Sequence, residues 1–232
     1  MKKVGFIGAY DKTDCVLYIA KILVELGHRV LFIDATITQK ARYIVPNIQT
    51  TKAYITNFEG IDVGVGMKSF EEVTEYLNLP QGSDLPYDIV LIDTNSAGGV
   101  ISYKLDDCEK MYFATSMDMY AIRKGIESLS VIKNQVNITK ILFSRYANKE
   151  EIEYLDYLSS GTNIVWNNQV IYYPFELGDQ TVIEKNQRVS KIKLMGLSPQ
   201  YKEGLMLTVG DILEQNNYKE ISKVFKKIEK GV

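Results

Sequence analysis

The sequence predicts an α/β fold in which helices flank a doubly wound, mostly parallel sheet. Short apolar runs alternate with amphipathic stretches of helical length along most of the 232 residues. The run IVLI at 89–92 shows no polar alternation, which is typical of a parallel strand buried on both faces. No linker rich in glycine, proline or serine interrupts the alternation, and there is no internal repeat. These observations favour one doubly wound domain.

The first forty residues predict a strand, a helix and a second strand. Residues 4–7 form the first apolar run, and apolar side chains then recur at helical spacing over 16–26. Gly27 is expected to end the helix. The run RVLFI at 29–33 gives the second strand and ends at Asp34. This order is that of a parallel β-α-β unit.

The same rhythm continues downstream, except in segment 38–58. That segment has no periodicity and is expected to be a connection that could carry a partner-binding surface. In a doubly wound sheet, ligands bind at the carboxyl ends of the strands, so the loops after Ile7, Ile33, Ile92 and Ala114 are the candidate site. The remaining predicted elements are strands at 61–65, 89–92, 111–114, 141–143, 163–166 and 170–172, and helices at 70–77, 119–132 and 150–158.

Composition and charge exclude several classes of protein. The chain is 46% hydrophobic and carries 27 basic against 29 acidic side chains, a net charge of −2, which disfavours wholesale coating of nucleic acid. Cys15 and Cys108 form no CxxC pair and His28 is the single histidine, so a disulfide framework or zinc site is not expected. No apolar run approaches the roughly 20 residues of a membrane span, and no signal-peptide pattern follows Met1. We therefore expect a cytoplasmic location.

The loop after the first strand has part of a phosphate-binding loop. In such a loop, glycines expose backbone N–H groups, a lysine contacts phosphate and a Ser or Thr hydroxyl binds Mg²⁺. The loop GAYDKTD at 8–14 has Lys12 and Thr13 at the start of the predicted helix, but Asp11 stands where a glycine is needed. The alternative interpretation is a helix start capped by Asp11 or Thr13, with Asp14 favouring the helix dipole. Tyr10 lies within the loop and could cover the site.

Several segments together resemble the ParA/MinD group of P-loop ATPases. RVLFIDAT at 29–36 resembles the family's second strand, and YDIVLIDT at 87–94 resembles its Walker B strand. ILFSR at 141–145 lies where the family has an Asn-Arg pair beside adenine, and IYYP at 171–174 resembles its Ile-Pro-Tyr-Asp stretch. The resemblance covers roughly residues 1–215, which we expect to form a P-loop NTPase-like domain.

The resemblance implies ATP or ADP with Mg²⁺ as cofactors, and it assigns roles to residues that match the family's motifs. Lys12 would contact the phosphates, and Asp93 would hold a metal-bound water. The implied nucleotide-binding residues are Gly8, Asp11, Lys12, Thr13, Asp14, Ser144, Arg145 and Pro174, the metal ligands are Thr13 and Asp93, and the candidate catalytic residue is Asp34.

Departures from the family pattern predict a degenerate member. The signature lysine is absent between Ile7 and Asp11, Thr36 replaces the second aspartate after the second strand, and Ser144 replaces the adenine-side asparagine. Because phosphoryl transfer depends on positioning and electrostatic stabilisation, we expect hydrolysis to be weak or lost. The chain thus resembles localisation factors of the TadZ/CpaE type. Its expected function is positioning, regulation or scaffolding of a larger assembly, as a homodimer with protein partners.

Two other functions stay open. One is an active ParA/MinD-type ATPase in plasmid or chromosome partitioning or membrane-site selection. The other is a small-molecule enzyme on a similar sheet, which is disfavoured because no set of nucleophile, base and orienting group is present.

The last segment, 216–232, is predicted to be a basic amphipathic helix, either part of the same domain or a tail. Its apolar face could lie on an anionic membrane, placing the protein at the inner face of the membrane. Packing on the sheet is favoured because the bulky apolar face of an interfacial anchor is missing. Nucleic acid is a possible partner that the charge does not favour.

Overall fold

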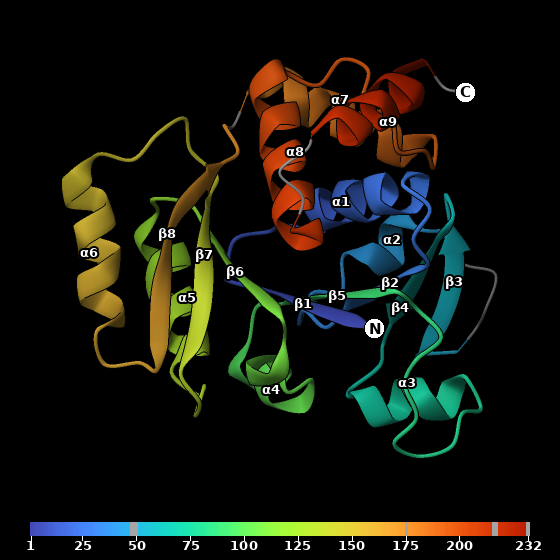
Figure 1. The fold of residues 1–232 in the computed structure, drawn as a ribbon, viewed down its shortest axis with the longest axis horizontal. Coiled ribbons are helices and arrows are strands. Elements are labelled where there is room, and N and C mark those ends of the chain that lie inside the picture. The colour runs from blue at the N-terminus through green and yellow to red at the C-terminus, as the bar shows by residue number, and fades with distance from the viewer. Residues whose placement is uncertain (47–50, 175, 215–217, 231–232) are drawn as a thin grey trace.

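The computed structural model describes residues 1–46, 51–174, 176–214 and 218–230, and an eight-stranded sheet runs through this part of the chain (Figure 1). The strands are β1 (Lys2–Ile7), β2 (Val30–Asp34), β3 (Tyr54–Phe58), β4 (Ile61–Val65), β5 (Ile89–Thr94), β6 (Lys110–Thr115), β7 (Val136–Leu142) and β8 (Ile164–Tyr172). The helices are α1 (Thr13–Glu25), α2 (Ala41–Ile44), α3 (Phe70–Tyr76), α4 (Ala97–Ser102), α5 (Met119–Leu129), α6 (Lys149–Ser159), α7 (Leu177–Arg188), α8 (Pro199–Leu213) and α9 (Lys219–Lys230), with a 3₁₀ turn at Leu105–Asp107.

The sheet is doubly wound, as predicted. Its strand order is β3-β4-β2-β5-β1-β6-β7-β8, and every neighbouring pair is parallel except β3 with β4. The central strands β2 and β5 are buried along their whole length, as their continuous apolar runs require. The carboxyl ends of β1, β2, β5 and β6 therefore meet at one edge, where the candidate loops begin.

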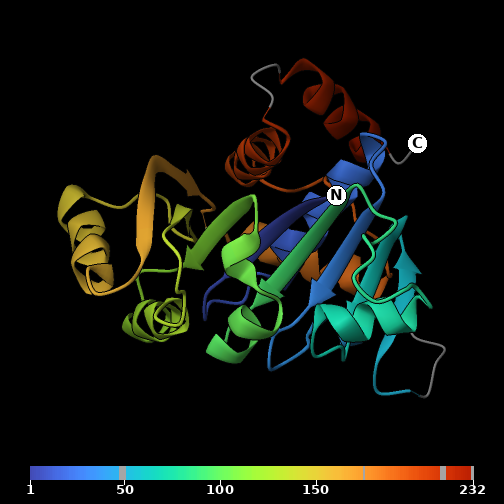
Figure 2. The ribbon, with the colours of Figure 1, turned by 60° about the horizontal axis from the view of Figure 1, so that its bottom comes forward.

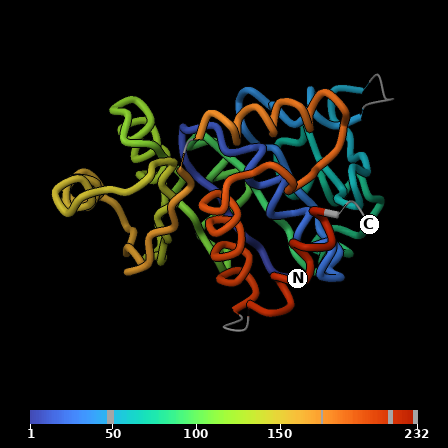
Figure 3. Tube along the Cα trace, turned by 90° about the horizontal axis from the view of Figure 1, so that it is seen from above, coloured from blue at the N-terminus to red at the C-terminus, as the bar shows by residue number. Residues whose placement is uncertain are grey.

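Helices cover both faces of the sheet (Figure 2). One apolar core lies under α1, α2, α8 and α9, and the other lies between the sheet and α3 to α6. Successive residues of a strand alternate between the two cores: Phe32 packs in the first and Ile33 in the second. Both α8 and α9 pack on α1, and Figure 3 shows these C-terminal helices over the first part of the chain.

The predicted strands are confirmed with varying precision. β4 has the predicted bounds, whereas the prediction for β7 was too short because the strand begins at Val136. Polar residues hid its first half: the buried Lys140 lies 4.4 Å from the Trp166 ring centre and 2.8 Å from Asp156. The two predicted strands at 163–166 and 170–172 are one continuous strand, β8, at the edge of the sheet.

The expectation of a connection without secondary structure over 38–58 was wrong for the described part of that segment, whereas positions 47–50 lie outside the described residues. It contains α2 and the antiparallel edge strand β3. Helices α7 and α8 were not predicted either, and they cover the first core.

The last helix packs on the protein with its apolar face. Ile221, Phe225 and Ile228 are buried against the first core, and Lys227 pairs with Glu25 of α1 at 2.9 Å. The helix is packed, as favoured, but it lies on α1 and α8 and not on the sheet itself. The proposed boundary near residue 216 falls outside the described residues. Within the described part of the chain, no helix combines the length and the apolar character that crossing a membrane requires.

Candidate functional site

The predicted site residues gather at the carboxyl edge of the sheet. The loop Gly8–Asp14 joins β1 to α1, Asp34 ends β2, and Asp93 lies next to it in β5. Strand pairing places Asp34 directly opposite Asp93, so two buried carboxylates are neighbours. The sheet topology alone brings together residues that are far apart in the sequence.

Position 8 must be glycine because the backbone there lies very close to the neighbouring strand β6. Its φ is +147°, and a Cβ at this position would lie 1.9 Å from the carbonyl oxygen of Ala114. Only glycine fits here, because any side chain would collide with β6. The loop therefore leaves the sheet in close contact with the next strand.

The ammonium of Lys12 points into the protein. Lys12 is 3% exposed, and its Nζ donates to the carbonyl oxygens of Gly8 (2.8 Å) and Thr94 (3.1 Å). It also lies 2.7 Å from Asp93 Oδ1 as an ion pair. The lysine that would contact a phosphate is thus committed to internal partners.

The two carboxylates beside Lys12 are also engaged. Thr13 Oγ1 donates to Asp93 Oδ2 at 3.1 Å. Burial raises the pKa of Asp93 to about 6, against the lowering effect of Lys12. Asp34 accepts from the backbone N–H groups of Thr36 (3.0 Å) and Ala41 (2.8 Å), so it fixes the turn between β2 and α2.

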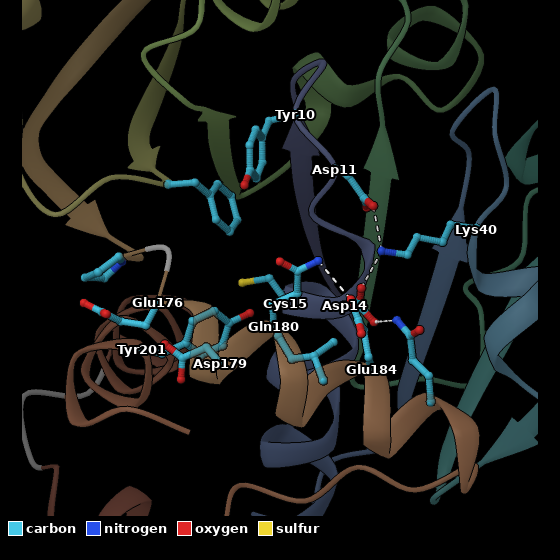
Figure 4. A pocket seen from close by; sticks show the side chains of 14 residues that line it. Tyr10, Asp11, Asp14, Cys15, Lys40, Glu176, Asp179, Gln180, Glu184 and Tyr201 are labelled. Atoms are coloured by element: carbon cyan, nitrogen blue, oxygen red, sulfur yellow. Dashed lines mark hydrogen bonds and ion pairs between the residues drawn. The ribbon is translucent and has the colours of Figure 1, made fainter. Parts of the chain in front are cut away.

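Lys40 joins the loop to the first helix. Its ammonium pairs with Asp11 (2.6 Å) and Asp14 (2.5 Å), as Figure 4 shows. Burial lowers the pKa of Lys40, but the two carboxylates raise it by more, and the net pKa is raised. Asp11 also accepts from the backbone N–H of Thr13 at 3.2 Å. Carboxylates and their lysine therefore occupy the start of α1, where a bound anion would lie.

Two cavities meet at the ion pair between Lys40 and Asp11. The first, about 430 Å³, lies between the loop, α7 and α8. The second, about 380 Å³, lies over Lys12, Thr13 and Asp93. Tyr10, Asp11 and Lys40 line both cavities and form the wall between them.

The predicted adenine-side residues lie around the first cavity. Pro174 lines it, whereas the Ser144 hydroxyl donates to the Tyr146 carbonyl oxygen at 2.8 Å. Arg145 pairs with Glu176 at 2.9 Å. Tyr10 stacks on Phe143 with ring centres 4.4 Å apart, so it covers the inner wall of this cavity.

Sequence reasoning missed the other charged residues of the site. Lys40 comes from the segment taken for an irregular connection, and Asp179 and Glu184 come from the unpredicted α7. A lysine six residues after Asp34 carries no motif of its own. The acidic content of α7 was visible, but its place beside the first helix depends on the fold.

A nucleoside triphosphate with Mg²⁺ does not fit this arrangement. Lys12 and Thr13 already donate to protein oxygens, and Asp11 and Asp14 place negative charge at the start of α1. Binding would require Lys12 to leave a buried ion pair, which is costly for the carboxylate left behind.

No protein-family model matches the sequence, and no curated protein matches it. A chain of the MinC:MinD cell division protein complex from Aquifex aeolicus is similar in structure, with a TM-score of 0.59 and 14% identity over 94% of this chain and 98% of that one. An McdA variant from Cyanothece in complex with ATP is similar with a TM-score of 0.61 and 10% identity, over 94% of this chain and 98% of that one. A third similar structure is a chain from Borrelia burgdorferi B31, described as a plasmid partition protein and bound to AMPPNP. Its TM-score is 0.51 and its identity 12%, over 97% of this chain and 98% of that one. Identities this low establish the fold alone. The chain therefore has the fold of the ParA/MinD-type ATPases.

Proposed function

We propose that this chain is a positioning, regulatory or scaffold factor for a larger assembly, in which ATP hydrolysis is weak or absent. The position of Lys12 carries the proposal. Its ammonium is buried and is held by Asp93 and by the carbonyl oxygens of Gly8 and Thr94. A P-loop enzyme needs this charge on the transferring phosphate, so its internal use removes electrostatic stabilisation from the reaction.

The replacement of the family's second aspartate after β2 by Thr36 supports the same proposal. Thr36 stands where the family has an aspartate that acts on water, and its hydroxyl donates to Asp34. Asp34 itself accepts two backbone hydrogen bonds. The pair is therefore used to shape the turn after β2, and we assign it no proton transfer.

The positioning role comes by analogy with the similar structures, which are named for cell division and plasmid partition. We propose a homodimer that binds protein partners, with residues 1–215 as the ParA/MinD-like unit and α9 packed on it. Membrane attachment through α9 is disfavoured because its apolar residues are already buried.

Calorimetry with ATP and Mg²⁺, paired with a phosphate-release assay, tests the proposal. We expect weak or undetectable binding and no turnover that depends on Lys12. The comparison uses Lys12→Ala and the control Lys149→Ala, whose side chain is 88% exposed on α6. Turnover that Lys12→Ala abolishes and Lys149→Ala preserves would establish an active ATPase and refute the proposal. Light scattering with and without ATP tests the dimer, and a monomer in both conditions contradicts it.

The active ATPase stays the second candidate because one contact of a metal site is retained. Thr13 Oγ1 lies 3.1 Å from Asp93 Oδ2, and such a hydroxyl and carboxylate serve Mg²⁺ in P-loop proteins. The assay above separates the two candidates directly.

A further inference from the structure

The cavity between the phosphate-loop position, α7 and α8 has an aromatic wall. Its volume of about 430 Å³ is in the range of small-molecule sites. Tyr10 stacks on Phe143 at 4.4 Å, and Phe143 stacks on Tyr173 at 5.5 Å. Tyr201 lines the cavity and meets Tyr173 edge to face at 5.2 Å. Aromatic faces of this kind attract organic cations.

The charged groups around this cavity are mostly acidic. Figure 4 shows Glu176 and Asp179 on one side of the cavity, and Asp11, Asp14 and Glu184 on the other side, where Lys40 reaches Asp11 and Asp14. The carboxylates that line it are Asp11, Asp14, Glu176, Asp179 and Glu184. Allowing for Lys40, for Arg145 paired with Glu176, and for about half a positive charge at the amino end of each of α1, α7 and α8, a net charge of about −1.5 remains.

Two of these carboxylates accept hydrogen bonds from neutral donors. Glu184 accepts from the neutral amide of Gln180 at 2.9 Å. Asp179 is 3% exposed and accepts from the hydroxyl of Ser198 at 2.7 Å and from its backbone N–H. Neutral donors stabilise a carboxylate without cancelling its charge, so the cavity keeps a negative potential.

We propose that this cavity binds an organic cation, a guanidinium or primary ammonium group, between the Tyr10 ring and the carboxylate of Glu184. The flat guanidinium matches both walls because it stacks on aromatic rings and donates to carboxylates in one plane. The cation is either a free small molecule or an arginine side chain of a partner protein. A nucleoside triphosphate is negatively charged, unlike this cation, and the carboxylates that line the cavity repel it. The inference does not depend on whether ATP is hydrolysed.

Calorimetry at low salt tests the site with agmatine as the free cation and acetyl-arginine-amide as the model of a protein side chain. Acetyl-citrulline-amide is the neutral control of nearly the same shape. We expect binding of a cation, no binding of the citrulline compound, and weaker binding at high salt. Agmatine carries two positive charges and the capped arginine one, so their comparison is made at high salt, where the charge difference is screened. Tighter binding of agmatine under that condition assigns a free ligand, and tighter binding of the capped arginine assigns a partner's side chain.

Matched variants show whether the binding is at this cavity. Removing the charge of a carboxylate that contacts a cation in a partly hydrated site weakens binding roughly threefold to tenfold or more, which is the effect expected for Glu184→Gln. Tyr10→Leu is expected to weaken it about twofold to fivefold. Glu153→Gln, on α6, is the control that leaves binding unchanged. No binding at 10 mM of either cation, or equal binding by Glu184→Gln and wild type, overturns the proposal. ATP turnover would refute the proposed function but would not affect the cation-binding result, because the two assays share no ligand.

Discussion

Replacing Lys12 with Met is expected to destabilise the protein, and more so at higher pH. The variant keeps the apolar stem of the side chain but leaves Asp93, which is 0% exposed, without its cation. Removing one partner of a buried ion pair typically costs about 3–5 kcal/mol of folding free energy. We expect a loss of this size at pH 8.

The pH dependence follows from the Asp93 carboxyl. In the wild type, burial raises its pKa to about 6 from an ordinary 3.8, and Lys12 restrains this rise. Without Lys12 the folded-state pKa rises further. Above pH 6, Asp93 of the wild type is ionised in the folded and unfolded states alike, whereas the variant binds a proton only when folded. The loss therefore grows by about 1.4 kcal/mol for each pH unit above 6, up to the pKa of the variant.

Urea denaturation at pH 5.5, 7 and 8 measures this difference in the free energy of unfolding. Lys149→Met, on an exposed side chain, is the matched control and should change stability by less than about 0.5 kcal/mol. A loss for Lys12→Met below about 1 kcal/mol, or one that is equal at pH 5.5 and pH 8, would refute the buried ion pair. The Lys12 ammonium would then be free to meet a ligand.

Three further changes test separate parts of the structure. Lys40→Met removes the bridge between two carboxylates at a partly buried position; thermal denaturation should show a loss of about 1 kcal/mol, and an unchanged midpoint contradicts it. Gly8→Ala should lower stability by more than about 3 kcal/mol because of its positive φ and its contact with Ala114, whereas Gly161→Ala, with open space around it, should be nearly neutral by urea denaturation. Ile221→Ala should cost about 2–5 kcal/mol because the side chain is fully buried; a loss below 0.5 kcal/mol would mean that α9 is detached in solution.

The sequence predicted the centre of the sheet and failed at its margins, for a physical reason. The strands β2 and β5 are buried on both faces, so their apolar runs alone identify them. The edge strand β3 carries polar residues on its open side, and its pairing with β4 depends on a hairpin that periodicity does not reveal. Helix α7 is mostly polar with few buried residues, so its pattern was too weak to predict.

The composition of the site was largely visible in the sequence, but its geometry was not. The motifs placed Lys12, Thr13 and Asp93 together because strand order is implied by the ParA/MinD resemblance. The direction of the Lys12 side chain depends on a carboxylate from a distant strand and on two carbonyl oxygens, which no local pattern specifies. Lys40 belongs to the site through the turn that Asp34 holds, and that turn became visible only in the folded chain.

The wall formed by Tyr10, Asp11 and Lys40 links the two cavities thermodynamically. A cation that draws Asp11 into the first cavity would take one of two carboxylates from Lys40. The ammonium, still paired with Asp14, would then be less fully neutralised and would make the second cavity more attractive to an anion. By linkage, an anion in the second cavity must strengthen cation binding in the first by the same factor. One lysine can thus make two ligands of opposite charge cooperative, with no movement of the sheet.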